Sequence, residues 1–314
     1  MQDTLLWNLP SLEPSSGLST WILVLVLGLG LAAWTGSSAD AGEPARSDRP
    51  QTIERPRTIE DFMTLGERPR VIAHRGFSGN APENTLVAIE QAIELGADMV
   101  EVDVGLTSDG HVVLLHDETL DRTTDGSGLL SDASLETVRR LDAGSWFAAE
   151  YEGEPVPTLG EALDLVRGRI LINIEIKGEA VGEQAAGGIV DKVLHAVRER
   201  QMLDQIVISS FEPRALEHAR QLDATVRTAS LYNRDLHSGQ GPLEVMNAVD
   251  ANGFNLSRRE VTAEIVEQCH GTGRPVAVYT VNKERVMCRM IDLGVDALFT
   301  DHPDRMLALL QEGS

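Results

Sequence analysis

Short apolar runs rich in β-branched residues alternate with amphipathic stretches from Pro69 to the end of the chain. The runs predict strands, and the stretches, whose apolar positions recur every three or four residues, predict helices with one buried face. The predicted strands cover residues 71–73, 99–104, 170–176, 206–209, 226–231, 253–256, 276–281 and 297–300. Strands that alternate with helices are typical of a parallel α/β fold, and these eight units in one domain predict a (β/α)8 TIM barrel.

One segment breaks the alternation after the second predicted strand. A turn sequence at residues 107–110 is followed by the apolar run at 112–115, which predicts a hairpin. If Asp109-Gly110 is a two-residue loop, His116 lies opposite Asp103, whereas a three-residue loop shifts the partner by one. Residues 117 to about 158, rich in Gly, Asp and Ser, then predict a small insertion in the barrel, in which Asp117 is interpreted as a solvated turn carboxylate.

An uncharged apolar run at residues 21–34 marks the front of the chain. It predicts a signal peptide or a membrane anchor within residues 1–41, followed by a linker at 42–66 and the barrel domain at 67–314. The run is short for a full span, and Ala39-Asp40-Ala41 resembles a signal-peptidase site, which favours export to the periplasm or the exterior. The absence of Lys and Arg before the run, with several Arg after it, fits instead an uncleaved anchor through residues 21–34 that leaves the catalytic part inside the cell.

The composition excludes some partners but does not identify the chemistry. With 49 acidic and 27 basic residues among 314, the formal charge of −22 repels nucleic acid, so no nucleic-acid partner is expected. Cys269 and Cys288 lack zinc-type spacing, and the sequence leaves open whether they pair or remain thiols. No pattern indicates an oligomeric state.

Three acidic residues fall at predicted strand ends. Glu101 and Asp103, two apart on one strand, point to the same face, and Glu175 ends the next barrel strand. At separations of roughly 5 Å and an effective dielectric near 20, each like-charged pair costs about 3 kcal/mol. A divalent cation removes that cost, and oxygen ligands point to Mg or Ca; neutralisation by protonation or by nearby cations is the alternative.

Two histidines and two cations complete a candidate site. His74 and His116 are predicted to be an acid/base pair, while Arg75 and Lys177 are suited to phosphate oxygens or to ion pairs with the acids. A divalent metal, proton-transfer groups and phosphate-neutralising cations together indicate metal-dependent phosphodiester cleavage. The possible substrate-lining residues are Phe211, Tyr279 and Asn282, although aromatic side chains at such positions are core residues equally often. Residues 82–85 predict a helix start, with Asn84 or Thr85 as the cap and no required function.

These motifs resemble the glycerophosphodiester phosphodiesterase family from about residue 70 to 305. The matching segments are His74-Arg75-Gly76, Pro82-Glu83-Asn84-Thr85, Glu101-Val102-Asp103-Val104, Thr107-Ser108-Asp109-Gly110, His116-Asp117, Leu120-Asp121-Arg122-Thr123-Thr124, Glu175-Ile176-Lys177, Ser209-Ser210-Phe211, Thr280-Val281-Asn282, Gly294-Val295-Asp296 and Thr300-Asp301. Tyr279 stands where many members carry Trp.

The resemblance implies a TIM barrel that hydrolyses small glycerophosphodiesters to sn-glycerol 3-phosphate and an alcohol, and so recovers glycerol phosphate from deacylated lipids. It implies a metal on Glu101, Asp103 and Glu175, acid/base roles for His74 and His116, and phosphate contacts from Arg75 and Lys177. Attack by the glycerol 2-hydroxyl and direct attack by water both stay open. Alternative functions are a lysophospholipase D or sphingomyelinase-D-like activity at a membrane, and a non-catalytic glycerophosphate-binding module.

Overall fold

A closed barrel of eight parallel strands organises the chain. The computed structural model describes residues 55–66, 68–182, 187–237 and 239–312. The barrel strands are β1 (Arg70–His74), β2 (Met99–Leu106), β4 (Leu171–Ile176), β5 (Ile206–Ser210), β6 (Arg227–Tyr232), β7 (Gly253–Ser257), β8 (Val276–Tyr279) and β9 (Ala297–Thr300). Each pairs with its neighbour, and pairing between β1 and both β2 and β9 closes the ring. The predicted TIM barrel and its strands are therefore confirmed.

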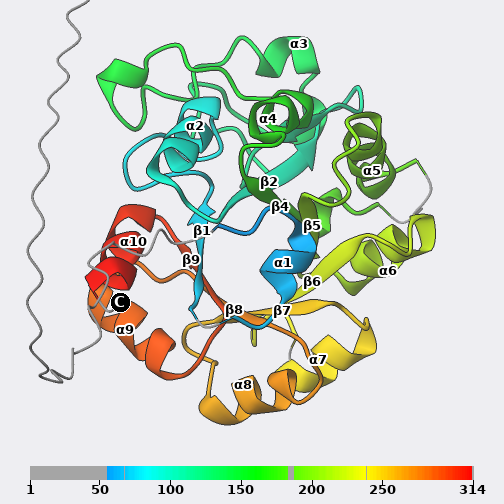
Figure 1. Ribbon diagram of the computed structural model, residues 1–314. Coiled ribbons are helices and arrows are strands. Elements are labelled where there is room, and N and C mark those ends of the chain that lie inside the picture. The colour runs from blue at the N-terminus through cyan, green and yellow to red at the C-terminus, as the bar shows by residue number, and fades with distance from the viewer. Residues whose placement is uncertain (1–54, 67, 183–186, 238, 313–314) are drawn as a thin grey trace, which may run out of the picture. The chain divides into compact units, whose positions relative to one another are not determined.

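Helices surround the barrel, as Figure 1 shows in a view along its axis. They are α2 (Leu86–Leu95), α4 (Leu159–Val166), α5 (Ile189–Glu199), α6 (Pro213–Leu222), α7 (Pro242–Ala248), α8 (Ala263–His270), α9 (Glu284–Asp292) and α10 (Pro303–Glu312). α5 illustrates why they dock: its apolar positions Ile189, Val193 and Val197 share one face and are buried against the strands, while Arg198 is exposed.

One end of the barrel is sealed by apolar side chains. The short helix α1 (Ile59–Met63) begins with a capping box in which Thr58 and Asp61 bond each other's backbone N–H groups. Its Ile59 and Phe62 pack onto inward-facing strand residues such as Ile72 and Met99, and Figure 1 shows α1 over the barrel axis. The apolar layer at this end leaves the opposite end, where the strands finish, for polar residues.

The strand register brings polar residues together at the carboxyl ends of the strands. His74 pairs with Glu101, and Asp103 pairs with Glu175, across adjacent parallel strands. Side chains alternate between the two faces of a strand, so Glu101 and Asp103 point inward while Val102 and Val104 pack on the helices. Closure of the barrel thus gathers residues from distant parts of the sequence around one mouth.

The register of the hairpin after β2 is shifted by one residue from the one that a two-residue loop predicts. β3 (Val112–Leu114) pairs antiparallel with β2, and Leu115 N–H donates to Asp103 O at 3.1 Å, so Leu115 and not His116 lies opposite Asp103. The loop has three residues, because Thr107 N–H already bonds His111 O. Gly110 ends it at φ 78°, the left-handed conformation that three-residue hairpin loops use.

The segment between β3 and α4 is the small insertion that the sequence predicts, and it has an apolar cluster of its own that the sequence pattern does not predict. It contains two 3₁₀ turns, η1 (Leu130–Asp132) and η2 (Ala149–Tyr151), and the short helix α3 (Leu135–Val138). Its buried side chains pack together beside the barrel; they include Leu115, Leu120, Leu130, Val138 and Val156. The insertion is therefore anchored directly after His116.

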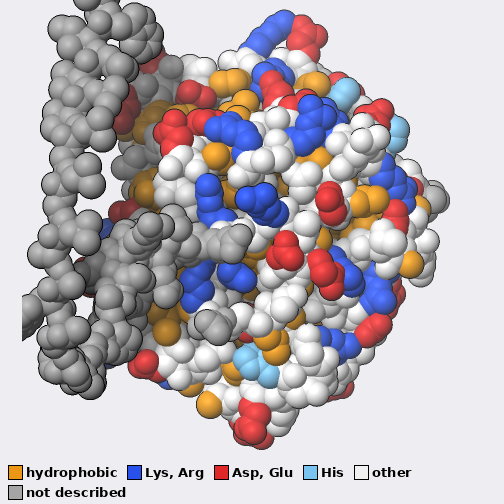
Figure 2. Space-filling view, viewed as in Figure 1, with side chains coloured by type: hydrophobic (Ala, Val, Ile, Leu, Met, Phe, Trp, Pro, Cys, Tyr) orange, Lys and Arg blue, Asp and Glu red, His pale blue; other side chains and the backbone are white. Residues whose placement is uncertain are grey.

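The surface mixes charges of both signs. On the face seen in Figure 2, basic side chains lie beside acidic ones, and pairs such as Arg169–Glu90 (2.5 Å) bridge separate segments. None of the described helices is long and apolar enough to cross a membrane. The apolar run at residues 21–34 lies outside the described residues. Cys269 is buried, Cys288 is exposed, and both are free thiols, so the two do not pair.

Candidate active site

Three buried carboxylates meet at the mouth of the barrel. Oxygens of Glu101 and Asp103 on β2 and of Glu175 on β4 all lie within 4.8 Å of one another. They meet because the strands place them on one face and because Asp103 and Glu175 are register partners. The structure therefore brings together the three acids that the sequence predicts as metal ligands.

Two cations neutralise part of this cluster. Lys177 Nζ lies 2.9 Å from Asp103 Oδ1 and 2.6 Å from Glu175 Oε1, and Arg75 Nε lies 3.1 Å from Asp103 Oδ2. Burial opposes the charge of Asp103, but Lys177 and Arg75 outweigh it and hold the pKa of Asp103 well below its usual range. Two cations against three carboxylates still leave an excess of negative charge.

That excess opposes the ionisation of Glu101. Its Oε2 accepts the Arg75 backbone N–H at 2.9 Å, whereas its buried Oε1 has no hydrogen-bond partner among the described residues. Burial and the Asp103 charge raise the pKa of Glu101 to about 8. A buried carboxylate oxygen that accepts no hydrogen bond is free to bind a cation. Together with two further carboxylates it supplies the oxygen ligands that Mg or Ca prefers. The residues present fit a divalent cation.

His74 is held by a carboxylate from the far end of the chain. Its Nδ1 lies 2.6 Å from Asp301 Oδ1, which leaves Nε2 on the site side, 4.0 Å from Glu101 Oε2. Burial opposes the imidazolium, but the Asp301 hydrogen bond and the Glu101 charge raise the pKa of His74 above its ordinary value. Asn282 Nδ2 donates to the other Asp301 oxygen at 2.5 Å. Burial opposes the charge of Asp301, but the contacts with His74 and Asn282 outweigh it and lower the pKa of Asp301 to about 2.

His116 has a matching arrangement. Its Nδ1 lies 2.5 Å from Asp117 Oδ1, and Asp117 in turn accepts from Arg122. The interpretation of Asp117 as a solvated turn carboxylate is therefore wrong, because the carboxylate is paired on both sides and only 28% exposed. Both histidines thus bind a carboxylate through Nδ1, which fixes the ring and leaves Nε2 for chemistry.

Residues 82–85 contribute to the site, although the sequence pattern predicts only a helix start there. Thr85 does cap α2, but Glu83 Oε1 pairs with Arg75 at 2.7 Å, and Asn84 exchanges two hydrogen bonds with Asp103. Asn84 reaches Asp103 from a left-handed conformation (φ 58°), which Asn tolerates better than most residues. The sequence carries two signals here, the polarity of these residues directly before an apolar helical stripe and their place among the segments that resemble the family.

The loop after β1 is held in an unusual backbone conformation. Arg75 has φ 56°, a conformation that costs free energy for a residue with a Cβ, and Gly76 has φ 79°. A Cβ on Gly76 would lie 2.6 Å from the Ala88 carbonyl carbon, so only glycine fits between the loop and α2. This close approach holds the Arg75 N–H against Glu101.

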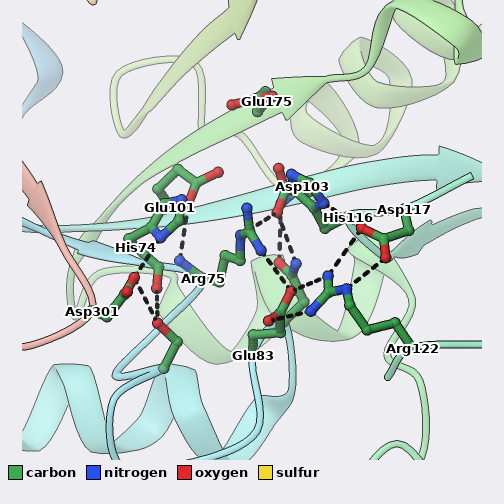
Figure 3. Close-up of polar contacts among 12 residues, drawn as sticks. His74, Arg75, Glu83, Glu101, Asp103, His116, Asp117, Arg122, Glu175 and Asp301 are labelled. Atoms are coloured by element: carbon green, nitrogen blue, oxygen red, sulfur yellow. Dashed lines mark hydrogen bonds and ion pairs between the residues drawn. The ribbon is translucent and has the colours of Figure 1, made fainter. Parts of the chain in front are cut away.

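The three residues suggested as possible substrate-lining groups have protein partners. The Tyr279 hydroxyl donates to Tyr232 O, and its ring packs edge-to-face on Phe211 with centroids 6.0 Å apart. Asn282 holds Asp301, as described above. In Figure 3, the predicted site residues His74, Glu101, Asp103 and His116 lie along β2 and the segments that flank it.

The barrel, with a polar cluster at the carboxyl ends of its strands, has the architecture of a TIM-barrel enzyme. A family model described as the glycerophosphoryl diester phosphodiesterase family matches residues 74–305. The chain belongs to this family, and it is a phosphoric diester hydrolase.

Individual relatives agree. A glycerophosphodiester phosphodiesterase of Caldanaerobacter subterraneus subsp. tengcongensis is 38% identical over 77% of this chain and 98% of its own length. One of Bacillus altitudinis is 37% identical, with coverage of 77% and 98%. Among solved structures, an Oleispira antarctica phosphodiesterase in complex with the product sn-glycerol-3-phosphate has a TM-score of 0.71 and 32% identity, covering 79% of this chain and 98% of its own.

Proposed function

We propose that the protein is a metal-dependent phosphodiesterase that hydrolyses small glycerophosphodiesters to sn-glycerol 3-phosphate and an alcohol. The observation that carries the proposal is the buried group of Glu101, Asp103 and Glu175, with one unpartnered carboxylate oxygen, beside two carboxylate-bound histidines. The family relationship and the sn-glycerol-3-phosphate bound to the Oleispira antarctica phosphodiesterase support the choice of substrate.

The acidic residues would hold the cation. Glu101, Asp103 and Glu175 are its proposed ligands, and Mg or Ca bound there would act as a Lewis acid on a phosphate oxygen. Arg75 and Lys177, which lie beside these acids, bind the remaining phosphate oxygens and oppose the charge that develops in the transition state.

The histidines move the protons. His74 and His116 keep Nδ1 on Asp301 and Asp117, so each offers Nε2 to the substrate. One imidazole accepts the proton of the attacking hydroxyl, and the other protonates the leaving alkoxide, whose unassisted departure is slow near neutral pH. This division of labour holds whether the attacking hydroxyl belongs to water or to the glycerol 2-position.

The test is release of glycerol 3-phosphate from glycerophosphocholine by the purified protein. EDTA should abolish release and Mg or Ca should restore it, while His74→Ala and His116→Ala should each lose about 100-fold or more in kcat. Lysophosphatidylcholine and sphingomyelin in the same assay test for a lysophospholipase D or sphingomyelinase D. Full turnover in EDTA would exclude the metal, and full turnover in both variants would exclude the histidine mechanism.

We further propose that the segment before the barrel directs the protein out of the cytoplasm, on the basis of the apolar run at 21–34 and the small residues that follow it. N-terminal sequencing of the mature protein tests this. A start at Gly42 supports export with a cleaved signal. An intact Met1 on membrane-bound protein would contradict export and support the alternative, an anchor through residues 21–34 that leaves the catalytic part inside the cell.

A further inference from the structure

Arg122, from the insertion, lies between two carboxylates that belong to different parts of the site. Its Nε and Nη2 donate to Asp117 at 2.6 and 3.0 Å, and its Nη1 and Nη2 donate to Glu83 at 2.9 and 2.8 Å. Figure 3 shows the guanidinium between the two acids. Planar guanidinium groups suit such paired contacts, whereas an ammonium offers only a point charge.

Each of these carboxylates holds a residue with a proposed role in the reaction. Asp117 bonds His116 Nδ1 at 2.5 Å, and Glu83 bonds Arg75 Nη1 at 2.7 Å. Arg75 in turn contacts Asp103. Within the described part of the chain, Arg122 therefore joins the proton-transfer group on the insertion to the phosphate-binding group and the metal ligands in the barrel.

A role in folding alone does not account for this arrangement. Arg122 is 43% exposed, and ion pairs at exposed positions stabilise proteins by about 1 kcal/mol or less. Its partners are more enclosed, with Glu83 only 13% and Asp117 28% exposed. Without the guanidinium, Glu83 and Asp117 would lose the cation between them. Among the described residues, Arg75, which also pairs with Asp103, would be the remaining cation beside Glu83. Each acid would then keep only the residue that it holds, Arg75 for Glu83 and His116 for Asp117, and no described ion pair would fix the two pairs relative to each other.

We propose that Arg122 is a positioning residue that couples the insertion to the barrel, holding His116 through Asp117 and Arg75 through Glu83. Its described hydrogen bonds go to Asp117 and Glu83 and not to Glu101, Asp103 or Glu175. The inference rests on the proposed function, because it assigns to Arg122 the alignment of groups that act in that reaction. Misalignment of such groups by about 1 Å can cost about 100-fold in rate.

The test compares Arg122→Gln and Arg122→Lys with Arg140→Gln. Arg140 lies on the same insertion in an ion pair with Glu136, but both side chains are about three-quarters exposed, at 75% and 76%, and contact no site residue in the described structure. Arg122→Gln should lower kcat by about 10- to 100-fold, with KM changed less than about threefold and the melting temperature near that of Arg140→Gln. Arg122→Lys should recover part of the loss, since an ammonium satisfies only one carboxylate well.

A double variant strengthens the comparison. If Arg122 acts partly through Glu83, then Glu83→Gln combined with Arg122→Gln should cost less than the product of the two single effects. A kcat for Arg122→Gln within about twofold of the Arg140→Gln value overturns the inference. If His116→Ala is inactive in that case, the proposed function survives. If His74→Ala and His116→Ala both keep full turnover, the proposed histidine mechanism fails instead, whatever Arg122 does.

Discussion

Replacing Glu101 with Gln should make the metal-free protein more stable while abolishing its response to metal. The carboxylate is buried, and one of its oxygens has no hydrogen-bond donor among the residues that the structure describes. Burial and the Asp103 charge raise its pKa from 4.5 to about 8. Gln keeps the shape and can still accept the Arg75 N–H through its amide oxygen. The substitution therefore removes a charge that the fold holds only at a cost.

The magnitude follows from the shift. A carboxyl group with a raised pKa in the folded state destabilises the fold, and the loss grows as the pH rises from about 4.5 towards about 8. Each pKa unit corresponds to about 1.4 kcal/mol, so the full loss above pH 8 is up to about 5 kcal/mol. Well below pH 4.5, the group is protonated in both states and the loss disappears.

Urea denaturation in EDTA at pH 5 and pH 8 measures the effect. The unmodified protein should lose several kcal/mol, about 3 or more, between the two pH values relative to Glu101→Gln. Glu150→Gln, an exposed position on the insertion, is the control and should follow the unmodified protein. Saturating Mg or Ca, at about 100 times the dissociation constant, should then stabilise the unmodified protein by about 3 kcal/mol and leave Glu101→Gln unchanged. Equal pH dependence in all three proteins would refute the reasoning.

The remaining predictions concern positioning, backbone and thiols. Asp301→Asn should lower kcat by about 100-fold or more, because the carboxylate that orients His74 is lost, and steady-state kinetics with unchanged circular dichroism would show it. Gly76→Ala should destabilise the protein by about 3 kcal/mol or more, because the new Cβ would meet the Ala88 backbone. Gly128→Ala, with φ 90° but open space around it, should cost about 1 kcal/mol. Equal losses in urea denaturation would contradict the close contact between Gly76 and Ala88. A thiol reagent should label one cysteine, Cys288, in the folded protein and both in urea; two labels without denaturant would place Cys269 at the surface.

The sequence predicts the fold and the chemical groups of the site because both depend on local patterns. Alternating apolar runs specify all eight barrel strands, and their ends carry the three acids, His74, Arg75 and Lys177, whereas His116 follows the hairpin strand β3. The spacing of Glu101 and Asp103 suffices to place them on one face, since side chains alternate along a strand. Parallel strands that close into a barrel then bring Glu175 beside them.

The supporting contacts could not be predicted because they depend on distances between segments far apart in the chain. Asp301 and His74 are 227 positions apart and meet only when β9 pairs with β1. The hairpin register turned on one hydrogen bond, between Thr107 N–H and His111 O, which no composition rule fixes. Arg122 lies in one of the segments that resemble the family, but no local pattern assigns it a role, which emerges only from the two carboxylates it joins.

A crystal structure of the protein with Ca and glycerol 3-phosphate tests the central claim most directly. The account predicts one ion bound by oxygens of Glu101, Asp103 and Glu175 at about 2.3–2.6 Å, with the phosphorus between Nε2 of His74 and Nε2 of His116. An ion held elsewhere, or a phosphate that only one of the two imidazoles can reach, would contradict it.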